Sequence, residues 1–95
     1  LYSFMDLTAL PGHELVVTGL NDLKAGRKSI EAMLVAVGSP RLRRAGIEVP
    51  EVDIENPEHE LFAMLASSDA DSPHARYNAL IRRLVSFERA LECVA

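Results

Sequence analysis

The stretch from His13 to Val37 carries the pattern that most constrains how this chain can fold. Apolar residues recur along it at spacings that alternate between four and three, which is typical of a helix that packs along its length against another helix. Because the phase of the pattern does not change, we expect one continuous helix over residues 11–37. Six positions form the apolar seam of this helix: Val16, Leu20, Leu23, Ile30, Leu34 and Val37.

Both ends of this predicted helix carry boundary signals. Pro11 suits a first helical turn, because the N–H that proline lacks would be unpaired there. Gly38 is followed by Ser39 and Pro40, a combination typical of a helix end.

Three glycines, Gly12, Gly19 and Gly26, lie beside the seam at intervals of seven residues. Glycine in a helix interior costs about 1 kcal/mol relative to alanine, so these positions need a reason. Two explanations stay open. The glycines allow a neighbouring helix backbone to approach closely, or the chain breaks near Ala25 and Gly26 and the stretch forms two helices.

Arg27 occupies the one seam position that is not apolar. A buried guanidinium there would bind an anionic ligand or fix the register of packed helices. The alternative, which we favour, is an arginine at the edge of the seam that reaches solvent or pairs with Asp22 or Glu31.

The remainder of the chain divides into segments whose boundaries carry proline or helix-start signals. Residues 40–45 favour a short helical turn. Residues 46–56 alternate apolar and acidic side chains, but Pro50 interrupts them and no second strand is available, so we expect an extended strap across a helical bundle. Asn56–Pro57 and Ser72–Pro73 are helix-start signals, which predict helices over residues 57–67 and 73–94.

Length and composition indicate one small all-α domain over residues 1–95. Apolar residues make up 48% of the chain and aromatic residues only 5%, so the core is mainly aliphatic, as suits helix-on-helix packing. We expect a small bundle of about three main helices. Residues 1–4, which precede the first methionine, are either added residues or the end of a longer upstream region.

Charge and cysteine content narrow the functional classes. The formal net charge of −4 argues against general attraction to nucleic acid or anionic membranes. Cys93 is the only cysteine and no apolar run approaches 18 residues, so we expect a cytoplasmic protein without a membrane span. Arginine outnumbers lysine eight to two, which is typical of chains from GC-rich bacterial genomes.

The segment from Met33 to Val37 is apolar around the whole helix and needs cover on more than one side. A second copy of the chain supplies such cover readily. We therefore expect a homodimer joined along the first helix through the six seam positions. The expected function is that of a protein-interaction or regulatory module, without catalysis.

Nucleic-acid binding is the first alternative. Arg41, Arg43 and Arg44 follow a turn-like segment, so residues 30–47 have the outline of a helix-turn-helix. The second helix would be only about two turns long, and an acidic segment follows it. We therefore prefer a solvated basic turn, partly paired with Glu48 and Glu51. The outward arginines of the last helix, Arg76, Arg82, Arg83 and Arg89, are likewise expected to be solvated or salt-bridged.

An enzyme or ligand-binding bundle with a site near Arg27 is the second alternative. His13, His59 and His74 have no partner at a metal-chelating spacing on a helix, and no phosphate-binding loop is present, so we expect no metal and no cofactor. Glu88 and Glu92 share one helix face, which is repulsive unless an arginine bridges them. The bridging arginine would come from elsewhere, and an interchain salt bridge is one way to supply it.

Overall fold

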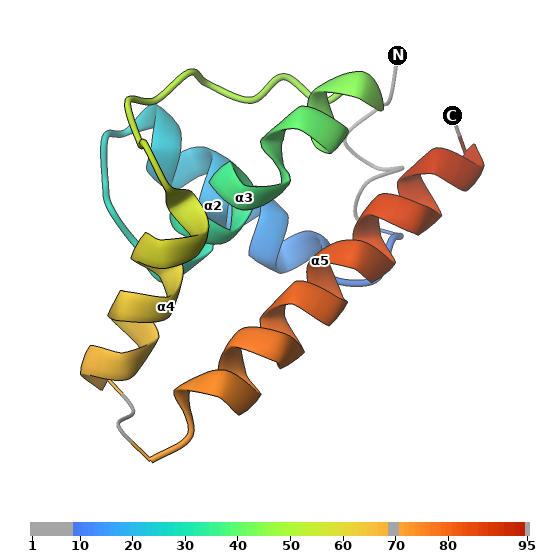
Figure 1. The fold of residues 1–95 in the computed structure, drawn as a ribbon. Coiled ribbons are helices and arrows are strands. Elements are labelled where there is room, and N and C mark those ends of the chain that lie inside the picture. The colour runs from blue at the N-terminus through green and yellow to red at the C-terminus, as the bar shows by residue number, and fades with distance from the viewer. Residues whose placement is uncertain (1–8, 69–70, 95) are drawn as a thin grey trace.

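The computed structural model describes residues 9–68 and 71–94, and this part of the chain is an all-α bundle, as predicted (Figure 1). Its helices are α2 (His13–Lys24), α3 (Ile30–Arg44), α4 (Pro57–Ser68) and α5 (Pro73–Val94). Helix α3 lies in the middle and packs against the other three. Helices α4 and α5 form a V whose arms both contact α3.

The prediction of one helix over residues 11–37 is wrong. Helix α2 ends at Lys24, and Gly26 adopts a left-handed conformation with φ of 75°, which is typical of a residue that terminates a helix. Helix α3 then starts with Ser29 as its N-cap, whose Oγ accepts a hydrogen bond from the amide of Ala32 at 3.0 Å. The alternative of two helices is confirmed.

The predicted helix end at Gly38 is also wrong, because α3 continues to Arg44 and contains the turn expected at residues 40–45. Gly38 instead lies against α5, where a Cβ atom would be 2.8 Å from Glu88 Oε2 and 3.0 Å from Leu84 Cδ2. Pro40 leaves the carbonyl of Ala36 without its usual amide donor. The helix ends before Gly46, whose φ is 101°.

The core is aliphatic and centred on α3. Met33, Leu34 and Val35 are each at most 1% exposed, so the segment that is apolar on all sides is covered by the chain itself. Helices α2, α4 and α5 supply the cover. Their buried apolar side chains are Val16, Leu23, Leu61, Leu65, Leu84, Phe87 and Leu91.

The connection from α3 to α4 is an extended strap, residues 46–56, as predicted (Figure 1). Ile47 and Val49 are buried and anchor its first half. Asn56 ends the strap, and its Oδ1 accepts a hydrogen bond from the amide of His59 at 3.2 Å in the first turn of α4. The predicted helices 57–67 and 73–94 agree with α4 and α5 to within one residue. Among the described residues, no helix has the length and apolar character needed to cross a bilayer.

Candidate functional site

The six seam positions lie in the chain's own core or beside it. Val16, Leu23 and Leu34 are 1%, 6% and 0% exposed. These three are covered by other helices of the same chain and are not free to contact a second copy in this conformation. The homodimer predicted through them therefore needs a different surface. The remaining seam positions are only partly buried against the core: Leu20, Ile30 and Val37.

Arg27 lies outside the packed seam, in the connection between α2 and α3. Its side chain is 65% exposed, and its Nε donates a hydrogen bond to Asp22 Oδ1 at 3.0 Å. Asp22 also accepts a hydrogen bond of 2.6 Å from Ser29 Oγ. This hydrogen bond, with a smaller effect from Arg27, lowers the pKa of Asp22. The favoured reading of Arg27 as a solvated, paired residue is confirmed.

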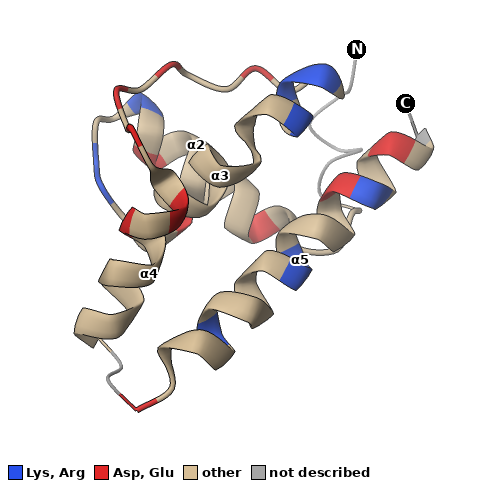
Figure 2. Ribbon diagram, in the orientation of Figure 1, with Lys and Arg blue, Asp and Glu red and all other residues tan. Residues whose placement is uncertain are grey.

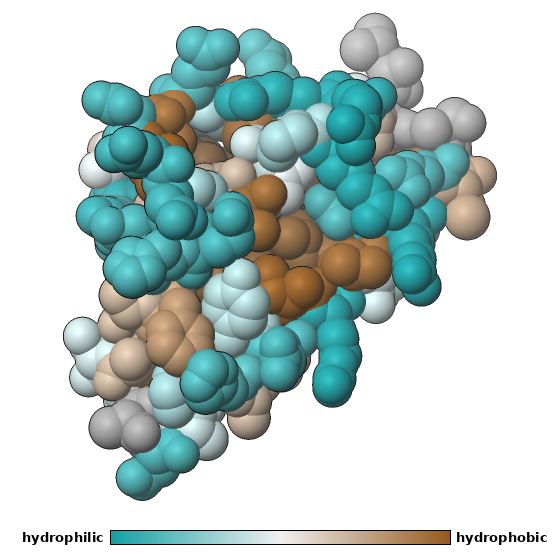
Figure 3. All heavy atoms as spheres, viewed as in Figure 1, coloured by the Kyte–Doolittle hydropathy of each residue, from teal (hydrophilic) through white to brown (hydrophobic). Residues whose placement is uncertain are grey.

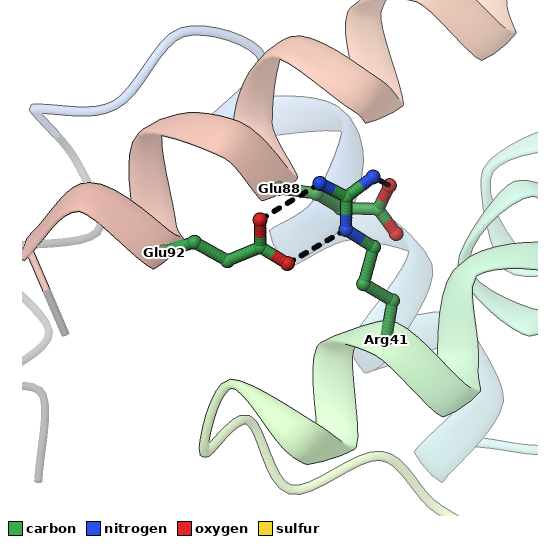
Figure 4. A network of polar contacts seen from close by, with 3 residues as sticks. All are labelled: Arg41, Glu88 and Glu92. Atoms are coloured by element: carbon green, nitrogen blue, oxygen red, sulfur yellow. Dashed lines mark hydrogen bonds and ion pairs between the residues drawn. The ribbon is translucent and has the colours of Figure 1, made fainter.

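Arg41 joins α3 to α5 by bridging two glutamates (Figure 4). Its Nε and Nη2 donate to the two carboxylate oxygens of Glu92, both at 2.7 Å, and its Nη1 lies 3.4 Å from Glu88 Oε1. The arginine that bridges this pair therefore comes from the same chain. An interchain salt bridge, the option raised by the sequence, is not needed to explain the pair.

Burial and hydrogen bonding shift these two glutamates in opposite directions. Glu88 is only 4% exposed, and desolvation raises its pKa even though Arg41 opposes the shift. Glu92 is exposed, and the hydrogen bonds from Arg41 lower its pKa. The same hydrogen bonds raise the pKa of Arg41, so its positive charge is firmly held. The network fixes α5 on α3 and leaves Arg41 little capacity for another anion.

The other two arginines of the basic turn differ from each other. Arg43 donates to the backbone carbonyls of Val49, at 3.3 and 3.1 Å, and of Pro50, at 3.3 Å, which holds the strap against α3. The side chain of Arg44 is exposed and makes no hydrogen bond or ion pair within residues 9–68 and 71–94, although its charge helps to lower the pKa of Glu92. The three arginines do not form a free cationic surface, and the expected pairing with Glu48 and Glu51 is not found. The helix-turn-helix outline is wrong, because α3 is continuous there.

The arginines of α5 are solvated or paired, as predicted. Arg83 donates to Glu14 of α2 at 2.7 Å, and Arg76 donates to a serine hydroxyl of α4 at 3.4 Å. Arg82 and Arg89 are exposed.

His13 and His74 contact neighbouring residues of the same chain. The Nδ1 atom of His13 lies 3.2 Å from the carbonyl oxygen of Leu10. The ring of His74 packs on Phe62 with a centroid separation of 4.7 Å. The described residues contain no cluster of three or more histidine, cysteine, aspartate or glutamate side chains that could hold a metal ion.

The second half of the strap makes no hydrogen bonds or ion pairs with the rest of the described chain. Within the part of the chain that the structure describes, no residue from Glu51 to Glu55 takes part in a hydrogen bond or ion pair. Val52 in this segment is 40% exposed. No other large apolar side chain among the described residues is as open to solvent. Figure 2 shows the acidic residues spaced along the strap and into the start of α4.

Three hollows follow the strap, and all of them are lined by Ile54. The largest, about 420 Å³, lies between the strap and α3 and continues to the start of α4. Its apolar lining includes Leu23, Val37 and Val49. A second hollow runs from Val52 to the loop between α2 and α3. The third lies at the C-terminal end of the strap, beside the start of α4. The strap is therefore flanked by a groove, which we call the strap groove.

The cations that line the strap groove are mostly neutralised. Arg27 is paired with Asp22, and Lys28 with Glu60 at 3.0 Å. Arg43 has no carboxylate partner among the described residues. Five carboxylates of the strap and the start of α4 have no cationic partner there: Glu48, Glu51, Asp53, Glu55 and Glu58.

The prediction of a strap was correct, but the exposure of its second half was missed. We expected its apolar side chains to cover the bundle, which holds for Ile47 and Val49 but not for Val52. The available signal was the acidic residue on each side of Val52, which opposes deep burial of this part of the strap. Comparisons of the chain with protein-family models, with curated proteins and with solved structures found no match.

Proposed function

We propose that this domain is a protein-interaction module that binds its partner along the strap and the strap groove. The observation that carries the proposal is the state of residues 51–55, which lie extended beside the groove and have no hydrogen bond or ion pair with the described residues. Extended segments with free backbone groups are common docking sites for peptide segments of other proteins. From the single cysteine and the arginine-rich composition, we place the module in the bacterial cytoplasm.

Nothing in the proposal requires a reaction. Of the charged side chains near the strap groove, Arg27 and Lys28 are in ion pairs, Arg43 holds the strap backbone, and the carboxylates of the strap are exposed. The exposed carboxylates are spread along the strap and do not converge on a buried polar site. Binding is the function that this chemistry supports.

Selection of binders from a displayed library of random peptides tests the proposed function. We expect peptides to be enriched against the domain and to lose binding when Val52 is replaced by aspartate. Arg82→Ala, a change on the exposed face of α5, is the matched control and should not affect binding. Failure to enrich any peptide, or enrichment that is insensitive to Val52→Asp, would contradict the proposal.

Self-association is a second candidate, and a different surface favours it. Figure 3 shows a partly exposed apolar region across the middle of the face that it draws, between the parts of the surface that α4 and α5 form. These two helices carry partly buried apolar side chains, including Met64 and Ile81. A second copy of the chain would bury such a surface and gain about 25 cal/mol for each Å² removed from water.

Sedimentation velocity over a range of protein concentrations tests self-association. We expect a mass of two chains at micromolar concentration and a shift toward one chain in Ile81→Glu. Val52→Glu, on the strap, should leave the mass unchanged. A mass of one chain at all concentrations would exclude the dimer.

A further inference from the structure

We propose that the partner of the strap groove is an extended segment of another protein in which lysine or arginine alternates with apolar residues, and that this segment pairs edge to edge with the backbone of residues 51–55. The inference rests on the proposed function and specifies the chemistry of the partner. Three properties of the strap support it: its free backbone, its charge and the shape of its surroundings.

The backbone of the strap has free hydrogen-bonding groups to which a strand can add. Residues 47–54 are neither helical nor paired as a strand, and the carbonyls of Val49 and Pro50 are held by Arg43. From Glu51 to Glu55 the amides and carbonyls have no partner among the described residues. A segment that adds to this edge therefore forms main-chain hydrogen bonds without breaking any.

The charge of the strap selects a basic partner. Glu51, Asp53 and Glu55 are exposed, occupy alternate positions and have no ion pair with described residues. Glu48, before residues 51–55, and Glu58, after them, add further negative charge. In a paired strand, opposite charges at facing positions attract and like charges repel. Alternate lysine or arginine residues on the added segment would meet these carboxylates, whereas nucleic acid would be repelled.

The apolar side chains beside the strap favour a partner segment with apolar residues between its basic ones. Val52 is 40% exposed, and Ile54 is partly buried and lines all three hollows along the strap. The side chains of a strand alternate between its two faces, so a segment whose basic residues face the carboxylates turns its other residues toward Val52 and Ile54. Apolar residues at these positions would complete the groove.

The chain does not contain this segment itself. Residues 1–8, 69–70 and 95, which lie outside the described part, have no lysine or arginine. Most of the lysines and arginines of the described part lie on helices, and Arg27 and Lys28, in the α2–α3 connection, are paired with carboxylates. A second copy therefore offers no extended segment with alternating basic residues. We therefore assign the occupant to a segment that is not part of these 95 residues.

Titration of the ¹⁵N-labelled domain with a defined peptide tests the inference. The probe is an acetylated and amidated octapeptide of alternating lysine and valine. Two matched peptides replace its lysines by glutamate or its valines by serine. We expect amide shifts at residues 51–55 with the lysine–valine peptide, weaker shifts with lysine–serine and none with glutamate–valine. Affinity should fall several-fold as sodium chloride is raised from low to high concentration, because salt screens exposed charges.

Variants that replace the strap carboxylates by amides test whether their charge is needed for binding. Asp53→Asn should weaken binding of the lysine–valine peptide by about twofold to fivefold, the effect of one exposed ion pair. The triple variant Glu51→Gln, Asp53→Asn, Glu55→Gln should abolish the shifts. Asp71→Asn removes one exposed carboxylate from the connection between α4 and α5 and is the matched control. It should bind as the parent does.

Backbone pairing has its own test, which leaves the protein unchanged. Methylation of alternate amide nitrogens of the peptide blocks one of its two edges. Peptides methylated on one set of alternate residues should lose binding, and those methylated on the other set should keep it. Equal binding of both sets would overturn the pairing.

The outcomes distinguish this inference from the proposed function. Selected peptides that bind through the strap but are neutral or acidic would overturn the inference and leave the proposed function standing. Strap shifts that grow with protein concentration in the absence of peptide would overturn it in favour of a second copy. Equal binding of the glutamate–valine peptide would also overturn it.

Discussion

Gly19 and Gly26 lie seven residues apart and have the same spacing signal in the sequence, but the structure gives them different roles. A Cβ atom on Gly19 would overlap the backbone carbonyl oxygen of Glu31 and Cγ2 of Val35, so glycine is needed there for the close approach of α2 and α3. Gly26 has no neighbour within 4 Å, and its φ of 75° is the reason for glycine. Both explanations that the spacing left open therefore hold, each at a different residue.

Asparagine at the two positions should separate these roles. Gly26→Asn should be tolerated, since asparagine adopts left-handed conformations more readily than other residues. Gly19→Asn and Gly19→Ala should each lower the free energy of unfolding by about 1–3 kcal/mol, because overpacking outweighs the better helix propensity of the new residue. Urea unfolding followed by circular dichroism measures both. A Gly19→Ala protein as stable as the parent would contradict the close approach.

Glu88 and Glu92 should affect stability with opposite dependence on pH. Burial raises the pKa of Glu88, so the folded state holds its proton more tightly than the unfolded state. Its contribution to stability therefore falls as the pH rises from the ordinary value of 4.5 through the raised pKa. The pKa of Glu92 is lowered, so its contribution is complete above 4.5 and is lost as the pH falls through the lowered pKa.

Glutamine variants measured by urea unfolding between pH 3 and pH 7 test this contrast. Relative to the parent, Glu88→Gln should gain stability as the pH rises above 4.5. Glu92→Gln should gain stability relative to the parent as the pH falls below 4.5. Stability curves that run parallel to the parent's across the whole range would show that neither group is shifted.

At the scale of the elements, the joint between α2 and α3 is held by a small polar cluster. Ser29 accepts from the amide of Ala32 at the start of α3 and donates to Asp22 near the end of α2. Arg27, between the two helices, completes the cluster through Asp22. This arrangement stabilises the reversal of the chain that Gly26 makes possible.

Ser29→Ala should lower the free energy of unfolding by about 0.5–2 kcal/mol, the usual effect of removing an N-cap side chain. Ser86→Ala is the control, because Ser86 is exposed within α5 and its hydroxyl has no hydrogen bond with described residues. Its effect should stay within about 0.5 kcal/mol. Equal effects of the two variants in thermal or urea unfolding would contradict the role of Ser29 as the cap.

At the scale of the whole molecule, the seam is an internal contact. The two halves of the pattern lie on α2 and α3, which pack against each other, and their central residues are buried without a second chain. The exposed surface that remains includes the strap with its unpaired carboxylates and the apolar region between α4 and α5 (Figures 2 and 3). Interaction with partners is therefore proposed for these surfaces and not for the seam.

Leu23→Glu distinguishes an internal seam from an interface. Leu23 is 6% exposed within one chain, so a glutamate there should lower the free energy of unfolding by about 2–5 kcal/mol or more at every protein concentration. Val52→Glu, on the exposed strap, should leave the melting temperature nearly unchanged. Circular dichroism at two concentrations measures both variants. A well-folded Leu23→Glu protein with an altered sedimentation mass would show that the seam is an interface.

The all-α class, the strap and the boundaries of α4 and α5 could be predicted from local sequence patterns, because those features depend on local chemistry. Caps such as Asn56–Pro57 act within one helical turn, and alternation of apolar and acidic residues needs no distant partner. Gly26 and Gly38 were harder, since a glycine that ends a helix and a glycine that admits a neighbour have the same sequence signature.

What covers each apolar face and where each arginine pairs could not be predicted from the sequence, because both depend on contacts between distant parts of the chain. Periodicity shows that one side of a helix is apolar, but two helices of one chain and two chains of a dimer can bury it equally well. Arg41 meets Glu92 across 51 residues of sequence, a contact that no local spacing encodes. The strap became a candidate binding surface for the same reason: its free backbone and carboxylates are defined by the absence of partners in the described fold, which depends on where every other element lies.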